Sequence, residues 1–191
     1  MGVCCNFYRL TSDQITEMTK RAERIIHTES MPHICDAFDP YLYLIDTGVI
    51  DEDDDEPDGD LRCCIFKAWY RLHEIFTEER KQDTFPANFI YGGTPFIERQ
   101  HYEKLLVGFW GGDNEITLLR LGRWFNPEET IQIRDYLMAF DLARLHVGNL
   151  EAMSCEWWPS QAAHLSEAIS KMRTFFQEAV EHGNCVVTLA D

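Results

Sequence analysis

The chain of 191 residues has no apolar run that approaches the roughly 20 residues needed by a membrane-spanning helix. Its N-terminus also lacks a basic region followed by a long apolar stretch, which argues against a secretory signal. Basic residues are scarce: 17 Lys and Arg stand against 33 Asp and Glu, so the formal net charge is −16. Such a charge repels nucleic acid and anionic membranes but attracts a basic protein. We therefore expect a cytoplasmic protein without a nucleic-acid or membrane partner.

The spacing of the cysteines excludes two common motifs. The seven cysteines include no C-x-x-C pair, so the sequence has neither a zinc ribbon nor a thioredoxin motif. Four of them form the adjacent pairs Cys4/Cys5 and Cys63/Cys64, and adjacent cysteines rarely bridge each other. We expect reduced thiols that pack as small apolar side chains.

Common catalytic signatures are missing as well. The sequence contains no H-E-x-x-H, G-x-S-x-G or G-x-G-x-x-G, and the Gly-Gly-Thr at 92–94 precedes Pro95, which indicates a turn. We assign no catalytic residue, no cofactor and no metal site. The candidates that the sequence offers for chemistry are His73, Cys63 and Cys64. A buried, hydrogen-bonded structural histidine is the simpler interpretation of His73.

The most strongly patterned stretch covers residues 61–79. Its apolar side chains recur at helical spacing, and charged side chains take the other side. The apolar set is Leu61, Ile65, Ala68, Trp69, Leu72, Ile75 and Phe76. This pattern predicts one amphipathic helix that packs on the core. Cys63 and Cys64 would lie in its first turn, where the helix dipole stabilises a thiolate.

The N-terminal part of the chain predicts a strand, a helix and a charged loop. Residues 3–10 favour a strand, and Thr11 or Ser12 can cap the helix that follows. Residues 51–60 hold eight carboxylates together with a proline and a glycine, which predicts a solvated acidic loop. An EF-hand is excluded because its twelfth position would be Ile65 instead of glutamate. Adventitious cation binding by the loop stays open.

The C-terminal part predicts a hairpin, two helices and a strand. The apolar runs 105–110 and 115–121 flank a glycine-containing turn, as in a hairpin. Asn126 caps a helix that we expect to extend to about Arg144, a second helix follows Ser160, and residues 185–189 form a closing strand. The predicted fold is a single α+β domain over 1–191, with several amphipathic helices packed on a small, mostly antiparallel sheet.

Several short segments occur in a recognisable order. They are KAW at 67–69 with Leu72-His73, IYGGTPF at 90–96, WFNPEETI at 124–131, residues 144–153 with Trp157-Trp158, and the closing helix with Gly183. Together they resemble the YfbM-like family, a group of small bacterial domains of unknown function. The resemblance extends over nearly the whole chain, although Phe66 stands where the family usually has an acidic residue. It implies a bacterial α+β protein and supplies no catalytic residues.

These observations lead to two hypotheses of function. The first is a non-enzymatic protein that binds another, cationic protein, with an immunity protein that neutralises a basic toxin as its most concrete form. The partner-binding residues would be Asp51, Asp53, Asp54, Asp55, Asp58, Trp157 and Trp158. The second hypothesis is a small hydrolase or ligand-binding domain with a pocket near His73 and the Trp157-Trp158 pair.

Overall fold

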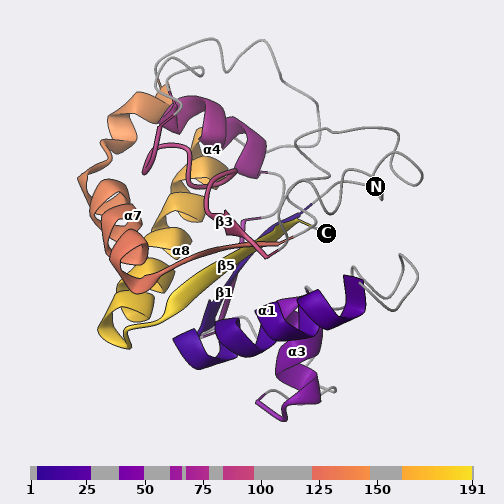
Figure 1. The fold of residues 1–191 in the computed structure, drawn as a ribbon. Coiled ribbons are helices and arrows are strands. Elements are labelled where there is room, and N and C mark those ends of the chain that lie inside the picture. Colours follow the sequence, from indigo (N-terminus) through magenta and orange to yellow (C-terminus); the bar gives the residue numbers. More distant parts are fainter. Residues whose placement is uncertain are drawn as a thin grey trace.

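The computed structural model describes residues 4–26, 39–49, 61–65, 68–77, 84–96, 122–146 and 161–190. Within these ranges five α-helices and one 3-10 helix accompany a sheet of five antiparallel strands (Figure 1). In chain order the elements are β1 (Cys5–Leu10), α1 (Ser12–Ile26), α3 (Pro40–Asp46), β2 (Arg62–Cys64), α4 (Ala68–Phe76), β3 (Thr94–Pro95), β4 (Arg123–Phe125), α7 (Pro127–Ala139), the 3-10 helix η1 (Leu142–His146), α8 (Gln161–Glu181) and β5 (Cys185–Ala190). The predicted α+β class is confirmed. The predicted acidic loop, the hairpin over 105–121 and Trp157-Trp158 lie outside the described residues.

The strand from the end of the chain lies at the centre of the sheet. The strand order is β2-β1-β5-β4-β3, and all neighbouring pairs are antiparallel. Strand β5 pairs with β1 from Cys5 opposite Ala190 to Leu10 opposite Cys185, and it also pairs with β4. All six residues of β1 are buried, so both faces of the sheet are covered.

Alternation along β1 divides the core into two layers. The ring of Phe7 points to one face, where its centroid lies 5.6 Å from that of Phe176 and 6.4 Å from that of Phe175, both on α8. Helices α4 and α7 pack against α8 on this side. Tyr8 points to the opposite face, where Figure 1 shows α1 and α3. The sheet therefore lies between two unequal layers of helices.

A capping box starts helix α1. The hydroxyl of Thr11 accepts a hydrogen bond from the N–H of Gln14 at 3.2 Å, and the N–H of Thr11 donates to Oε1 of Gln14 at 2.8 Å. Of the two caps that the sequence allowed, Thr11 is therefore the one used. Ser12 is the first residue of the helix.

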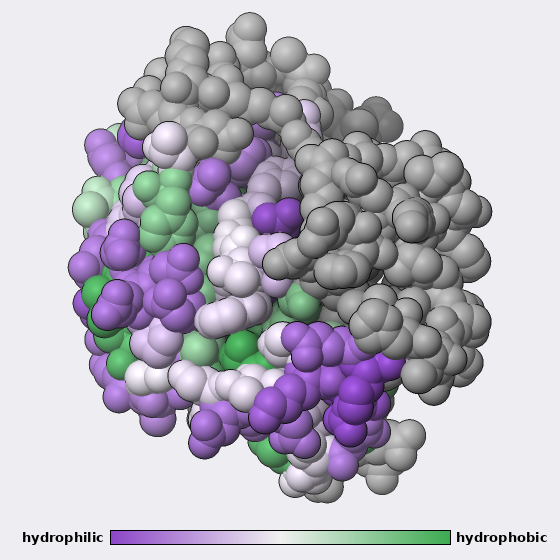
Figure 2. Space-filling view, viewed as in Figure 1, coloured by the Kyte–Doolittle hydropathy of each residue, from purple (hydrophilic) through white to green (hydrophobic). Residues whose placement is uncertain are grey.

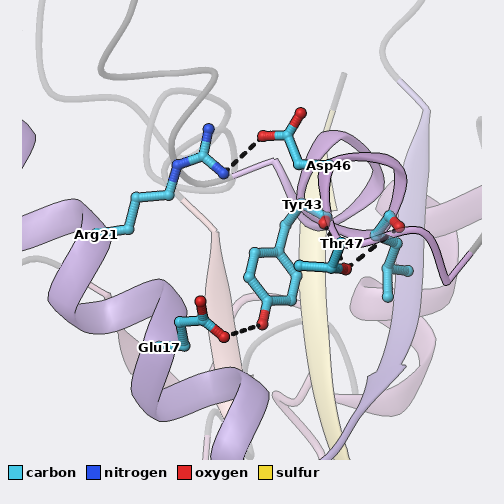
Figure 3. A network of polar contacts seen from close by, with 6 residues as sticks. Glu17, Arg21, Tyr43, Asp46 and Thr47 are labelled. Atoms are coloured by element: carbon cyan, nitrogen blue, oxygen red, sulfur yellow. Dashed lines mark hydrogen bonds and ion pairs between the residues drawn. The ribbon is translucent and has the colours of Figure 1, made fainter.

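Two polar contacts tie α3 to α1 (Figure 3). The hydroxyl of Tyr43 donates to Oε2 of Glu17 at 2.8 Å, and Nη1 of Arg21 donates to Oδ2 of Asp46 at 2.7 Å. Burial of Tyr43, together with the hydrogen bond to Glu17 and its charge, raises the pKa of Tyr43 to about 12. Tyr43 therefore stays protonated as a donor throughout the neutral pH range.

The single helix predicted over 61–79 is wrong in its first part. Residues 62–64 form β2, and α4 begins only at Ala68. Pairing with β1 sets this strand: Cys63 lies opposite Phe7, and the N–H of Ile65 donates to the carbonyl of Cys5 at 3.0 Å. Long-range pairing thus overrides the local helical spacing. The predicted buried side is confirmed within α4 at Ala68, Trp69, Leu72 and Phe76.

Helix α7 begins as predicted. Oδ1 of Asn126 accepts from the N–H of Glu129, and the N–H of Asn126 donates to Oε2 of Glu129, both at 2.9 Å. Pro127 takes the first helical position, where a missing N–H does no harm.

The end of α7 differs from the prediction. The helix stops at Ala139 and not near Arg144, because Phe140 is extended with a ψ of 125°. Arg173 of α8 donates from Nε to the carbonyl of Leu137 at 2.8 Å and from Nη2 to that of Phe140 at 2.7 Å. A side chain from a distant helix therefore satisfies two carbonyls at this end, and no local residue signals it.

Two glycines turn the chain where the sequence predicts turns. Gly183 has a φ of +64° and ends α8 before the closing strand, which covers 185–190. Gly93 has a φ of +95° in the turn before β3, and an added Cβ would lie 3.0 Å from Cζ of Phe125. Only glycine fits this position without a shift of the core.

Candidate functional site

A groove between strand β2 and helix α8 contains the two candidate thiols. Its volume is about 430 Å³, within the range of small-molecule sites. The lining residues are Arg62, Cys63, Cys64, Ser170, Lys171, Thr174, Phe175 and Glu178. The walls thus combine two thiols, two hydroxyls, an aromatic ring and charges of both signs. Such a surface could hold a small ligand that has both polar and apolar parts.

The structure contradicts the predicted setting of Cys63 and Cys64. They lie in β2 and not in the first turn of a helix, so the dipole of α4 does not act on them as expected. Their exposed fractions are 5% and 8%. An activated nucleophile needs a lowered pKa and access to substrate. The sequence predicted that a helix N-terminus would lower the pKa of these two thiols, but no helix begins at either residue.

The register of β1 and β2 explains why the cysteines are not bridged. Cys63 lies opposite Phe7, which places it diagonally from Cys5 on the same face of the sheet. Diagonal residues on neighbouring strands are about 7–8 Å apart, whereas a disulfide needs Cα atoms within about 6.8 Å. The five cysteines in the described ranges form no disulfide with one another.

A partly buried ion pair beside the groove was not predicted. Nη1 of Arg9 lies 3.3 Å from Oε2 of Glu178, and the Arg9 guanidinium lies 5.9 Å from the ring centroid of Phe175. Arg9 is 5% exposed, and within the described part of the chain its Nε has no hydrogen-bond partner. Glu178 and Phe175 also line the groove, so the ion pair supports one wall of it. The only signal in the sequence is a charged residue inside a mostly apolar strand.

The candidate His73 belongs to the core. It is 3% exposed, and its ring meets that of Tyr91 edge-on, with centroids 4.2 Å apart. Trp69, one turn earlier on α4, also packs edge-on against Tyr91 at 5.7 Å. This favours the structural interpretation of His73. His73 does not line the groove that contains Cys63 and Cys64.

A second groove lies where α1 meets the start of α7. Its volume is about 470 Å³, and it is lined by Ser12, Ile15, Thr16, Thr19, Lys20, Glu23, Trp124, Asn126, Pro127 and Cys185. Sγ of Cys185 lies 3.6 Å from the hydroxyl of Ser12. Burial raises the pKa of the Cys185 thiol, and this outweighs the opposing hydrogen bond from Ser12. Cys185 is therefore held as a neutral thiol. At the two helix starts beside this groove, those of α1 and α7, capping boxes already use backbone N–H groups.

The described residues hold no group of three or more His, Cys, Asp and Glu side chains placed to bind a metal ion. None of the helices in the same ranges is long and apolar enough to cross a membrane. The proposed partner-binding residues in 51–58, together with Trp157 and Trp158, lie outside these ranges.

Comparison with known proteins identifies a family. A family model described as a domain of unknown function (DUF1877) matches residues 1–107, more than half of the chain. The match runs from β1 past β3 and ends before β4, α7, α8 and β5. It is compatible with the resemblance to YfbM-like domains. No curated protein and no solved structure matches the chain. The chain belongs to the DUF1877 family of domains of unknown function.

Proposed function

We propose that this protein acts by binding another protein that has a basic surface. Its most concrete form is an immunity protein that neutralises a basic toxin. The observation that supports the proposal is the uneven distribution of charge between the residues that the structure describes and the remaining segments of the sequence.

The scaffold is close to charge balance. The described residues contain 13 of the 33 Asp and Glu and 11 of the 17 Lys and Arg. The other segments therefore hold 20 acidic and six basic residues and account for nearly all of the net charge of −16. Eight of these carboxylates are consecutive or nearly so within 51–60. The charge is concentrated outside the described helices and strands, which supports a role for it in binding a partner.

The acidic segment is followed in the sequence by an edge of the sheet. Leu61 follows Asp60, and its carbonyl accepts a hydrogen bond from the N–H of Arg9 at 2.9 Å, immediately before β2. Eight carboxylates thus come just before β2, an edge strand of the described sheet, in the sequence. Clustered charge raises the rate of association with an oppositely charged protein and makes it sensitive to salt. Trp157 and Trp158 would add aromatic anchors to the same interface.

The test compares three forms of the full chain in affinity capture. One variant replaces Asp51, Asp53, Asp54, Asp55 and Asp58 by Asn. A matched control shuffles residues 51–60 and keeps all eight carboxylates. We expect the wild type and the shuffled control to capture the same protein at about 50 mM salt and to release it at about 500 mM, where screening is strong. The Asn variant should fail to capture it.

The captured protein is then purified and mixed with each form. The proposal predicts an association rate that falls with salt for the wild type and is low for the Asn variant at all salt concentrations. Equal association rates for the two forms, or rates that do not change with salt, would contradict it.

A second candidate function is a ligand-binding domain, and the groove between β2 and α8 favours it. This groove has the size of a ligand site, and His73 is not among its lining residues, although the sequence predicted a pocket near His73. Thr174→Trp would fill the groove from α8. A thermal-shift screen of small polar ligands that stabilises the wild type but not this variant would support a ligand site, and no response in the wild type would contradict it.

A further inference from the structure

We infer that the outward face of α7 docks a basic amphipathic helix of the partner protein. The inference rests on the proposed function because it takes the partner to be basic. It concerns a part of the chain that is separate from the acidic segment 51–60.

Helix α7 exposes apolar side chains in a regular row. Its exposed residues recur at helical spacing along one side: Glu128, Ile131, Gln132, Asp135, Met138 and Ala139. We call this set the α7 stripe. The exposed fractions of Ile131 and Met138 are 40% and 55%. Among the large apolar side chains that the described residues expose, these two share one helix face.

The fold does not need the apolar residues of the α7 stripe. Thr130, Ile133 and Leu137 already fix the inner side of the helix, and each is fully buried. The capping box of Asn126 holds the first turn, and Arg173 binds the last carbonyls. Ile131 and Met138 therefore contribute little to folding while they expose apolar area to water. Methionine is also enriched at the centres of protein interfaces.

The charge on the α7 stripe is of one sign. Glu128 and Asp135 alternate with the apolar residues, and the stripe contains no Lys or Arg. The neighbouring Arg134 is directed to Oδ1 of Asp135 at 2.6 Å and to Gln177 at 2.9 Å. Asp135 is still 65% exposed, so its carboxylate can also meet a cation from outside. A complementary surface carries apolar side chains flanked by Lys or Arg.

The spacing selects a helix as the occupant. Ile131 and Met138 are two turns apart, which corresponds to about 10.5 Å along the axis. A partner helix with apolar residues at i and i+7 has the same spacing, and helices bind to such surfaces through i, i+3, i+4 and i+7 contacts. Figure 2 shows hydrophobic residues among hydrophilic ones on the left of the molecule, where α7 lies in Figure 1.

The test uses a synthetic peptide of about 18 residues with Leu on one helical face and Lys on the other. A peptide of the same composition in shuffled order is the control probe. The protein variant is Ile131→Gln with Met138→Gln, which keeps good helix formers in α7. The matched control is Leu42→Gln with Val49→Gln, which removes exposed apolar area from the opposite side of the sheet. Circular dichroism verifies that both variants stay folded.

We expect the amphipathic peptide to bind the wild type and the Leu42/Val49 control with similar affinity. The Ile131/Met138 variant should bind it about tenfold more weakly or worse, and NMR shifts in the wild type should change along α7. Equal binding of the shuffled peptide, or unchanged affinity of the Ile131/Met138 variant, would overturn the inference. The Asn variant of the acidic segment separates the two proposals: if it alone loses the peptide, the acidic segment and not α7 is the contact.

Discussion

The ion pair between Arg9 and Glu178 should respond very differently to the loss of each partner. Arg9 is 5% exposed, whereas the Glu178 side chain is 32% exposed. If Arg9 is removed, water can therefore solvate the Glu178 carboxylate. If the carboxylate is removed, water cannot reach the Arg9 guanidinium in the same way. Glu178→Gln leaves a buried cation without its carboxylate. Removal of one partner from a buried pair costs about 3–5 kcal/mol, and partial hydration of this pair places the expected loss at about 2–3 kcal/mol.

The reverse change should be mild. Arg9→Met removes the buried charge and its contact with Phe175, which at 5.9 Å lies near the outer limit for a cation–π interaction. A methionine of similar length keeps the apolar packing and can contact the same ring. Replacement of a buried ion by a well-packed apolar side chain is often nearly neutral, so we expect a change within about 1 kcal/mol.

The assay is urea denaturation at pH 7, followed by far-ultraviolet circular dichroism. The midpoint should fall clearly for Glu178→Gln and little for Arg9→Met, with unchanged slopes. The double variant should be more stable than Glu178→Gln alone, because it no longer buries an unpaired cation. If Arg9→Met destabilises the protein as much as Glu178→Gln does, the guanidinium is a net source of stability and the reasoning is wrong.

Three further predictions follow from local geometry. Asn126→Ala removes the side-chain oxygen that accepts from the N–H of Glu129 and should lower the free energy of unfolding by about 1 kcal/mol in denaturant titrations, whereas Asn126→Ser should keep most of that stability. Gly93→Ala should destabilise more than Gly48→Ala in the same titrations: both have positive φ, but the new Cβ lies 3.0 Å from core atoms at Gly93 and meets nothing within 4 Å at Gly48. Because the pKa of Tyr43 is raised to about 12 from an ordinary value of 10.0, its stabilising effect is fully present below pH 10 and should be lost between pH 10 and 12. Tyr43→Phe should flatten this alkaline decline, and an unchanged decline would show that the ionisation of buried Tyr43 does not cause it.

Sequence patterns predicted the elements whose signals are local. Asn126 and Pro127 marked the start of α7, and Gly183 marked the end of α8, because caps and turns depend on a few adjacent residues. The choice between Thr11 and Ser12 could also have been made from the sequence. Glutamine stands three residues after Thr11, and this spacing is the signature of a capping box.

The wrong predictions share a long-range cause. The apolar residues around 62–64 continue the helical spacing of α4, yet residues 62–64 pair with β1 and form a strand. Arg173 of α8 helps to end α7, and no residue near Phe140 reveals this. The predicted setting of Cys63 was wrong for the same reason: its place in the fold depends on pairing with strand β1. The contact of Arg9 with Glu178 likewise becomes visible only when β1 and α8 are placed together.

The part of the chain that matches the family model, residues 1–107, shares its core with the C-terminal part. Residues 1–107 include β1, β2 and α4 but not β5, which fills the space between β1 and β4. Without α8 and β5, the ring of Phe7 would lose Phe175 and Phe176, and β1 would lose six paired residues. The matched part therefore depends on the C-terminal part for its core. Because that C-terminal part also carries the α7 stripe, the surface proposed for docking is joined to strands β1 and β2 through β5.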